Sequence, residues 1–219
     1  MKKIIKYLFL LTGGSFILAS CNDFLDREPL DSVTPDNFFF TENDLAAYAV
    51  KHYNFTTHEG FNAGIWKNDN ATDNQAATDY DKKWIPGQWK VPEAYDNPAS
   101  NDPWYFSTIR EANYFLETVV PRFEKGEIEG SETNIKHYIG EMYFLRAKNY
   151  LSKLETFGDF PIIKNTLPDE SESLIQASKR APRYKVAHFI LEDLDQAISL
   201  LTNNISGGKN RITKNAEIG

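Results

Sequence analysis

Apolar side chains recur at the three- and four-residue spacing of an amphipathic helix in four parts of this 219-residue chain. The first part is 42–54, where Leu45 and Tyr48 fall on the same face. Thr41 and Asp44 stand at its start with the spacing of a capping box. The pattern therefore predicts a helix over 42–54.

The second helical segment is bounded by prolines. Asp102 is a suitable N-cap, and Pro103 suits the first helical position because its missing N–H has no partner there in any case. Pro121 cannot continue a helix, so the sequence predicts a helix that ends before it.

The two remaining helical segments carry the longest apolar stripes. One is predicted over 132–156, stopped by Gly158 and Pro161, and the other from near Pro182 to Leu201. The stripe of the first consists of Ile135, Tyr138, Ile139, Met142, Leu145, Tyr150, Leu151 and Leu154, and that of the second of Val186, Phe189, Ile190, Leu194, Ala197, Ile198 and Leu201.

The segments between these helices have no sustained period. Residues 24–40 are short apolar runs broken by Pro29 and Pro35, which predicts an extended tether. Residues 56–101 are rich in Asn, Asp, Gly and Pro but also carry large aromatic residues, which are depleted in disordered chains. The prediction is an all-α fold with long loops. Helices in pairs suggest a helical-repeat stack, although the loop lengths differ too much to demonstrate a repeat.

The N-terminus has the pattern of a secretory signal. Three lysines precede an apolar run that is too short to span a bilayer comfortably, and the run ends in Leu18-Ala19-Ser20-Cys21. Small residues before a cysteine form a lipobox, so we expect residues 1–20 to be a lipoprotein signal peptide. Cys21, the only cysteine of the chain, is then the first mature residue and the acylated one, and it anchors the protein to a membrane.

Charge narrows the class of ligand. Removing the signal removes three lysines and no acidic residue, so the formal net charge goes from −7 to −10. Such an acidic chain disfavours nucleic acid as a partner. A neutral or cationic ligand is favoured over an anionic one unless local basic groups intervene.

The segment 56–101 holds the residues best suited to bind a sugar. Carbohydrate recognition needs flat aromatic faces for the C–H surface and polar side chains for the hydroxyl groups. The candidate ligand-binding residues are Asp73, Asn74, Tyr80, Asp81, Trp84 and Trp89. Each of these aromatics could instead pack the loop onto the helices. Trp84 and Trp89 flank Pro86-Gly87, a turn signal.

Other residues that could carry chemistry are expected to be structural. Trp66 and Trp104 are interpreted as core positions, and mid-helix Arg146 as part of an internal ion pair or an exposed face. The histidines show no metal-ligand spacing, so no metal or cofactor is predicted. No catalytic motif appears, which predicts a protein that is not an enzyme. A glycoside hydrolase stays open, because sequence separation cannot test a pair of carboxylates.

Several motifs resemble the SusD/RagB family of lipoproteins. The mature start from Cys21 to Asp26, with Pro29 and the run Thr34 to Phe39, is similar to the start of that family. Downstream similarities are Trp104-Tyr105, Ile109-Arg110, Ala112-Asn113, Glu141, Phe144-Leu145-Arg146-Ala147, Tyr150, Gly158-Asp159-Phe160-Pro161, Asp193-Leu194, Ala197 and Leu200-Leu201. One departure is Ala181-Pro182, which stands where the family has a polar helix cap.

The resemblance implies a tetratricopeptide-like helical scaffold displayed on the outer membrane, facing the exterior. It implies capture of oligosaccharides and pairing with a SusC-type TonB-dependent transporter; a RagB-like member would bind peptides instead. The expected organisation is signal peptide 1–20, tether 21–40 and helical domain 41–219. The family continues for a long C-terminal portion where this chain stops at Gly219, in what reads as a new helix after Thr213, so we expect the domain to be truncated there.

The anchor can be tested at its acceptor residue. Changing Cys21 to Ala removes the thiol that acylation requires, so the variant should stay uncleaved or become soluble. Detergent partitioning and intact-mass measurement check this. If the variant partitioned with membranes as a cleaved, lipid-modified protein, the predicted anchor would be wrong.

Overall fold

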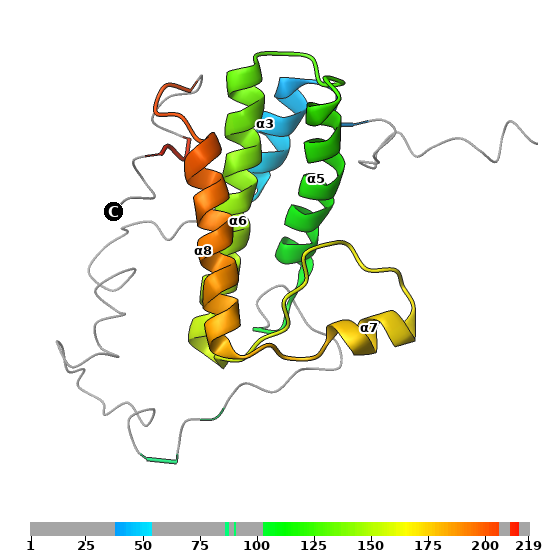
Figure 1. Cartoon of the computed structure of the whole chain (residues 1–219), viewed down its shortest axis with the longest axis vertical. Coiled ribbons are helices and arrows are strands. Elements are labelled where there is room, and N and C mark those ends of the chain that lie inside the picture. Colours follow the sequence, from blue (N-terminus) through cyan, green and yellow to red (C-terminus); the bar gives the residue numbers. More distant parts are fainter. Residues whose placement is uncertain (1–37, 54–85, 88–89, 91–102, 206–210, 215–219) are drawn as a thin grey trace, which may run out of the picture. The chain divides into compact units, whose positions relative to one another are not determined.

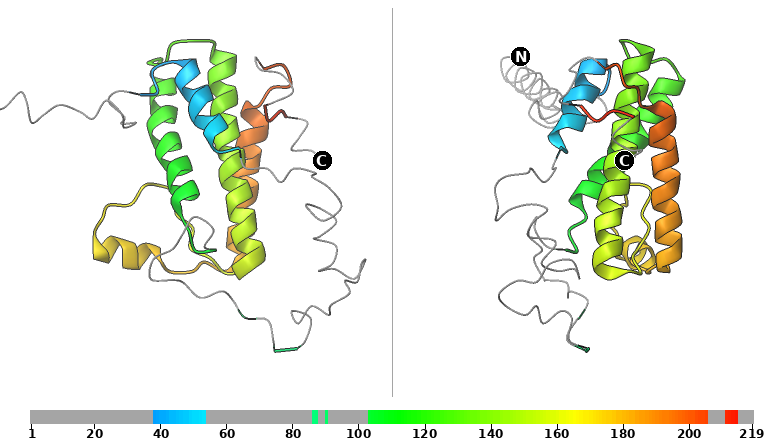
Figure 2. Two further views of the ribbon diagram at one scale, coloured as in Figure 1. Left: turned by 180° about the vertical axis from the view of Figure 1, so that it is seen from behind. Right: turned by 90° about the vertical axis from the view of Figure 1, so that its left-hand side faces the viewer.

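α6 is the central helix of the structure. The computed structural model describes residues 38–53, 86–87, 90, 103–205 and 211–214. In these residues the helices are α3 (Glu42–Lys51), α5 (Ser107–Glu124), α6 (Glu132–Phe157), α7 (Ser171–Ala177) and α8 (Arg183–Leu200), with isolated bridges but no strands (Figure 1). α6 packs against α3, α5 and α8, as the views from behind and from the side also show (Figure 2). The predicted all-α class is confirmed.

α3 begins where the sequence predicts. The side chain of Thr41 accepts a hydrogen bond from the N–H of Asp44 at 3.3 Å, and the Asp44 carboxylate accepts one from the N–H of Thr41 at 3.0 Å. Just before this capping box, Phe39 adopts the left-handed φ of 70° and is fully buried, edge-on to Tyr48 and Phe115. Burial of its ring between α3 and α5 offsets the cost of that backbone conformation.

The predicted boundaries of α5 are wrong at both ends. The helix begins at Ser107, and Pro103 lies in a turn before it, while Asp102 lies outside the described residues. Pro121 does not end the helix, because a proline in the last turn removes a single hydrogen bond. The helix ends at Glu124, and two residues later Gly126 adopts a left-handed φ of 70°, which glycine tolerates, with its N–H donating to the carbonyl of Phe123.

α6 and α8 match their predicted ranges closely and form the main helix pair. Gly140 allows them to approach, because a Cβ there would lie 3.0 Å from the side chain of Leu201. Most of the predicted stripes are buried, but Leu151 is an exception and is 45% exposed. Leu151 is therefore a surface residue rather than part of the core.

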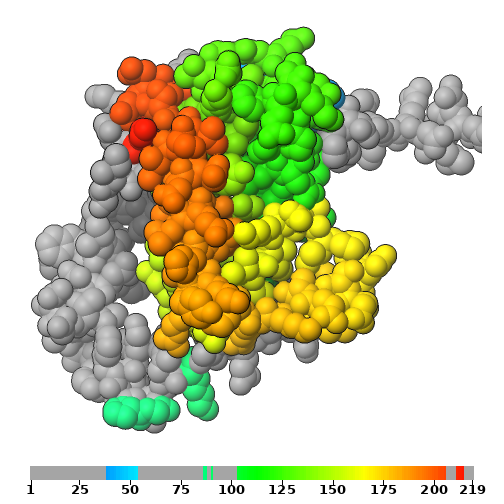
Figure 3. All heavy atoms as spheres, viewed as in Figure 1, coloured from blue at the N-terminus to red at the C-terminus, as the bar shows by residue number. Residues whose placement is uncertain are grey.

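The segment between α6 and α8 contains α7, a helix that the sequence analysis did not predict. No residue of α7 is buried, which explains why its apolar pattern is short. In the space-filling view α7 and the residues before it (yellow) form an edge of the molecule beside α5 and α8 (Figure 3). A bridge between Phe160 and Ala181 closes the base of this segment.

Asp159 resolves the unusual start of α8. Pro182 occupies the N-cap position and has no side chain that can accept a hydrogen bond. The Asp159 carboxylate accepts a hydrogen bond from the N–H of Arg183 at 2.8 Å, so a residue of the preceding segment acts as the cap. The bridge between Phe160 and Ala181 brings Asp159 close to Arg183.

A buried ion pair joins α6 to α8. Nε and Nη2 of Arg146 donate to the two carboxylate oxygens of Asp193, each at 2.7 Å. Nη1 of Arg146 donates to the side-chain oxygen of Asn113 on α5 at 2.8 Å. The prediction of an internal ion pair for Arg146 is confirmed. Burial raises the pKa of Asp193, and the hydrogen bonds from Arg146 oppose that rise.

The same network fixes the irregular chain that follows α6. The side-chain amide of Asn113 donates to the carbonyl oxygens of Ile163 and Asn165, at 2.8 and 3.3 Å. The hydroxyl of Tyr150 accepts a hydrogen bond from the N–H of Ile163 at 2.8 Å and donates to its carbonyl at 3.2 Å. Side chains of α5 and α6 thus replace the hydrogen bonds that this stretch cannot make with itself.

The ion pair generates a stability prediction. Arg146→Met leaves Asp193 buried without its partner and should destabilise the fold by about 3–5 kcal/mol, whereas Arg146→Met with Asp193→Leu should recover part of that loss. Urea denaturation followed by circular dichroism measures both. Arg183→Met is the matched control, because its pair with Asp159 is exposed and such pairs contribute about 0–1 kcal/mol. A double variant no more stable than Arg146→Met would contradict the prediction.

Tyr150 generates a prediction about alkaline pH. Burial raises its pKa from 10.0 to about 12, so the folded state holds the neutral phenol more strongly than the unfolded chain does. The resulting stability is complete below pH 10 and is lost as the pH rises towards 12. Tyr150→Phe should be less stable at pH 8, because Ile163 loses its partner, but its stability should fall less steeply between pH 10 and 12. Urea titrations at each pH test this; parallel curves for the two proteins would refute it.

Candidate functional site

All six predicted ligand-binding residues lie outside the described residues, as does Cys21. This holds for Asp73, Asn74, Tyr80, Asp81, Trp84 and Trp89, so their roles stay predictions. The turn predicted between the two tryptophans is described and confirmed: Pro86 and Gly87 form an exposed turn, with a φ of 78° at Gly87. The structure also describes how the helical body holds the chain on both sides of 54–102.

The chain leaves α3 through His52 and Tyr53, which are tied down by different contacts. Nδ1 of His52 lies 3.3 Å from the Glu111 carboxylate, and burial lowers the pKa of this histidine. The hydroxyl of Tyr53 accepts a hydrogen bond from the N–H of Ile212 at 3.1 Å. Burial raises the pKa of Tyr53, and the nearby Glu141 carboxylate raises it further. Burial thus favours the uncharged form of both side chains.

A buried carboxylate stands behind Tyr53. Glu141 of α6 is fully buried and accepts hydrogen bonds from Nε and Nη2 of Arg211 at 3.0 and 2.8 Å. Nε2 of His137 lies 3.0 Å from the same carboxylate, and Nδ1 of His137 accepts a hydrogen bond from the N–H of Thr202 at 3.1 Å. Because Nδ1 is an acceptor, Nε2 carries the proton and donates it to Glu141. Both oxygens of the buried Glu141 carboxylate thus accept hydrogen bonds from side chains of the fold.

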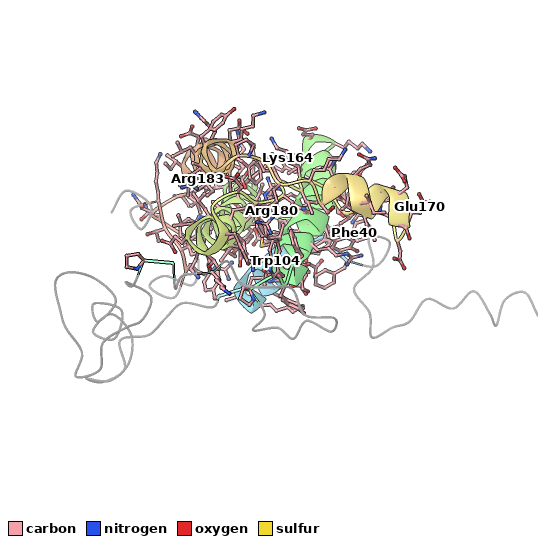
Figure 4. The ribbon with its side chains drawn as sticks, turned by 90° about the horizontal axis from the view of Figure 1, so that it is seen from below. Phe40, Trp104, Lys164, Glu170, Arg180 and Arg183 are labelled. Carbon is pink, nitrogen blue, oxygen red and sulfur yellow. The ribbon has the colours of Figure 1, made fainter. Side chains whose placement is uncertain are left out.

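On the other side of 54–102, Pro103 and Trp104 contact the helical body. The ammonium group of Lys153 donates to the carbonyl oxygen of Pro103. The Trp104 ring lies 4.1 Å from the ring of Phe157 and 5.6 Å from that of Phe160, measured between centroids. The guanidinium of Arg180 lies over Trp104 at 4.8 Å, and Figure 4 shows these two side chains from below.

Trp104 is both a packing residue and a wall of a cavity. A cavity of about 370 Å³ lies among α5, α7 and the chain between α6 and α7. It is lined by Trp104, Phe106, Ile109, Arg110, Asn113, Pro161, Ile163, Asn165, Leu167, Leu174, Ala177 and Ser178. The interpretation of Trp104 as core is therefore half right, because the ring packs on the core but is only partly buried. Sequence reasoning missed the cavity, since α7 supplies one wall.

The described residues contain no group of three or more His, Cys, Asp or Glu side chains placed to hold a metal ion. None of the described helices combines the length and apolar character needed to cross a bilayer. No acidic side chain lines the cavity.

The chain matches the model of a protein family described as starch-binding and associating with the outer membrane, over residues 23–219. A SusD-like protein of Formosa agariphila is 27% identical over 203 residues, which are 90% of this chain and 37% of that protein. A second SusD-like protein of the same organism is 26% identical over 186 residues, or 82% of this chain and 35% of that protein.

A solved structure agrees with these sequence relatives. The crystal structure of a SusD-like protein from Bacteroides fragilis is similar with a TM-score of 0.56 and 25% identity, covering 87% of this chain and 36% of that one. The chain thus spans little more than a third of the length of the relatives it matches. The match confirms the resemblance and its tetratricopeptide-like helical scaffold. From the family match over almost the whole chain, we conclude that the protein belongs to the SusD-like family.

Proposed function

We propose that this protein is a lipid-anchored binding protein of the outer membrane that captures oligosaccharides at the cell exterior and passes them to a SusC-type TonB-dependent transporter. The observation that carries the proposal is the match over residues 23–219 to a family described as starch-binding. The signal and lipobox ending in Cys21 support the anchor.

The contacts of the helical body support a structural role for the helices and a ligand-binding role for 56–101. Its buried charged groups, Arg146 with Asp193 and Arg211 with Glu141, are engaged with one another. Sugar recognition needs polar groups that are still able to pair with hydroxyls. We therefore assign recognition to 56–101, with Trp84 and Trp89 as stacking platforms beside the turn at Pro86-Gly87.

Binding without hydrolysis is part of the proposal. Glycoside hydrolysis uses two carboxyl groups across the scissile bond, and the cavity beside Trp104 has no acidic lining residue. The buried carboxylates of Glu141 and Asp193 hold arginine side chains and cannot reach a substrate. Both carboxylates have structural work in the fold, which favours a binding role.

The loop tryptophans provide the test. A glycan array on the full-length gene product identifies a ligand, and titration calorimetry then compares Trp84→Ala and Trp89→Ala with the parent protein. Loss of a stacked ring should weaken affinity about tenfold or more, because aromatic stacking contributes on the order of 1 kcal/mol beyond area burial. Helix content and melting temperature should stay nearly unchanged.

A control separates binding from packing. Trp104→Ala removes a ring that packs on Phe157 and should lower the melting temperature instead. Truncation of a large core residue typically reduces the free energy of unfolding by roughly 3–5 kcal/mol. If the loop variants behaved like Trp104→Ala and bound normally, their rings would be packing residues. Binding of peptides but no glycan would favour a RagB-like role, and release of shorter sugars during titration would show an enzyme.

A further inference from the structure

We propose that the cavity beside Trp104 is a second binding site, which takes a monocarboxylate with an aryl or alkyl body. This inference does not rest on the proposed glycan function, since the cavity is built from α5, α7 and the chain between α6 and α7. Its volume of about 370 Å³ falls in the range of roughly 300–1,000 Å³ that is usual for small-molecule sites. A cavity of about 150 Å³ already holds a benzene ring, so a ring with a short side chain fits.

The cavity walls favour a hydrocarbon body. The lining is largely aliphatic or aromatic, through Phe106, Ile109, Pro161, Ile163, Leu167, Leu174 and Ala177. Burying such surface against an apolar ligand removes both from water. The predominance of carbon on the walls makes the interior suited to an aryl or alkyl group.

Two polar side chains of the lining, Asn113 and Ser178, already have partners within the fold. The Asn113 amide donates to the carbonyls of Ile163 and Asn165, and its oxygen accepts from Arg146. The Ser178 hydroxyl donates to the carbonyl of Ile175 at 2.8 Å. These two side chains therefore offer the hydroxyl groups of a sugar few hydrogen bonds, and burying a hydroxyl group without a partner is costly. The site differs in kind from a glycan platform.

Two arginines give the site its charge. Arg110 lines the cavity and is exposed, and Arg180, which is not itself a lining residue, lies over the ring of the lining residue Trp104. Within the described part of the chain neither guanidinium forms an ion pair with a carboxylate, whereas Arg146 and Arg211 do. A planar guanidinium pairs with a carboxylate through two parallel hydrogen bonds. An apolar cavity beside two such groups fits an amphipathic anion.

The test compares three matched probes on the full-length gene product, produced from Asn22 onward so that no detergent micelle competes for the ligand. 3-Phenylpropanoate carries both the ring and the carboxylate, 3-phenylpropan-1-ol lacks the charge, and glucuronate keeps the charge on a sugar. Titration calorimetry should show the acid binding about tenfold more tightly than the alcohol, and no binding of glucuronate. Failure of the acid to bind, equal affinity for acid and alcohol, or comparable binding of glucuronate would each overturn the proposal.

Variants locate the site. Arg110→Gln and Arg180→Gln should each weaken the acid severalfold and leave the alcohol unchanged, while the exposed Arg183→Gln is a control that changes neither. Ala177→Phe fills the cavity from α7 and should weaken both probes about tenfold or more. It should not alter melting, because no residue of α7 is buried. Unchanged binding to a folded Ala177→Phe protein would place the ligand elsewhere and refute the site.

Discussion

The bidentate pair between Arg146 and Asp193 is the interaction on which the packing of α5, α6 and α8 and the path of the chain after α6 depend. It is the point where α6 meets α8, and through Asn113 it reaches α5 as well. A buried charge is costly unless each of its hydrogen-bonding groups is satisfied, so the pair fixes the rotation of three helices about their axes. The two carbonyls bound by Asn113 then set where the chain runs after α6. The path of this chain places Phe160, and the ring of Trp104 packs against Phe160.

A second buried pair does the same for another irregular segment. Arg211 bonds to Glu141 of α6 and also donates to the carbonyl of Ala46 on α3 at 3.2 Å. Apolar stripes hold helices to one another because helices satisfy their own backbone groups. Irregular segments cannot do so, and they need side-chain partners when they lie against the core. In the first place Asn113 of α5, held by Arg146 of α6, binds the irregular segment, and in the second Glu141 of α6 binds it directly.

The sequence predicted the parts of the fold that depend on local pattern. α6 and α8 were correct because long stripes and clear stop signals set their ends, and the capping box located α3. α7 was missed since it buries nothing, so no stripe marks it. The pairing of Arg146 with Asp193 could not be read from the sequence, because the two residues are 47 positions apart and only the packing of α6 on α8 joins them. The i to i+4 spacing of His137 and Glu141 was a local signal that could have indicated the second cluster.

The candidate sites also differ in how far the sequence could predict them. Aromatic and amide residues can be recognised by type, so composition alone led to the prediction that 56–101 binds sugar, and the six residues named for it lie outside the described part of the chain. A cavity depends on several segments at once. Arg110 and Leu174 lie 64 positions apart in sequence and both line this one. They come together only because Asn113 and Tyr150 fix the chain between α6 and α7. The hydrogen bonds that fix this chain also consume the polar capacity of Asn113. The interactions that create the cavity therefore leave Asn113 little capacity to bind sugar hydroxyls, which agrees with our proposal that glycan recognition belongs to residues outside the cavity.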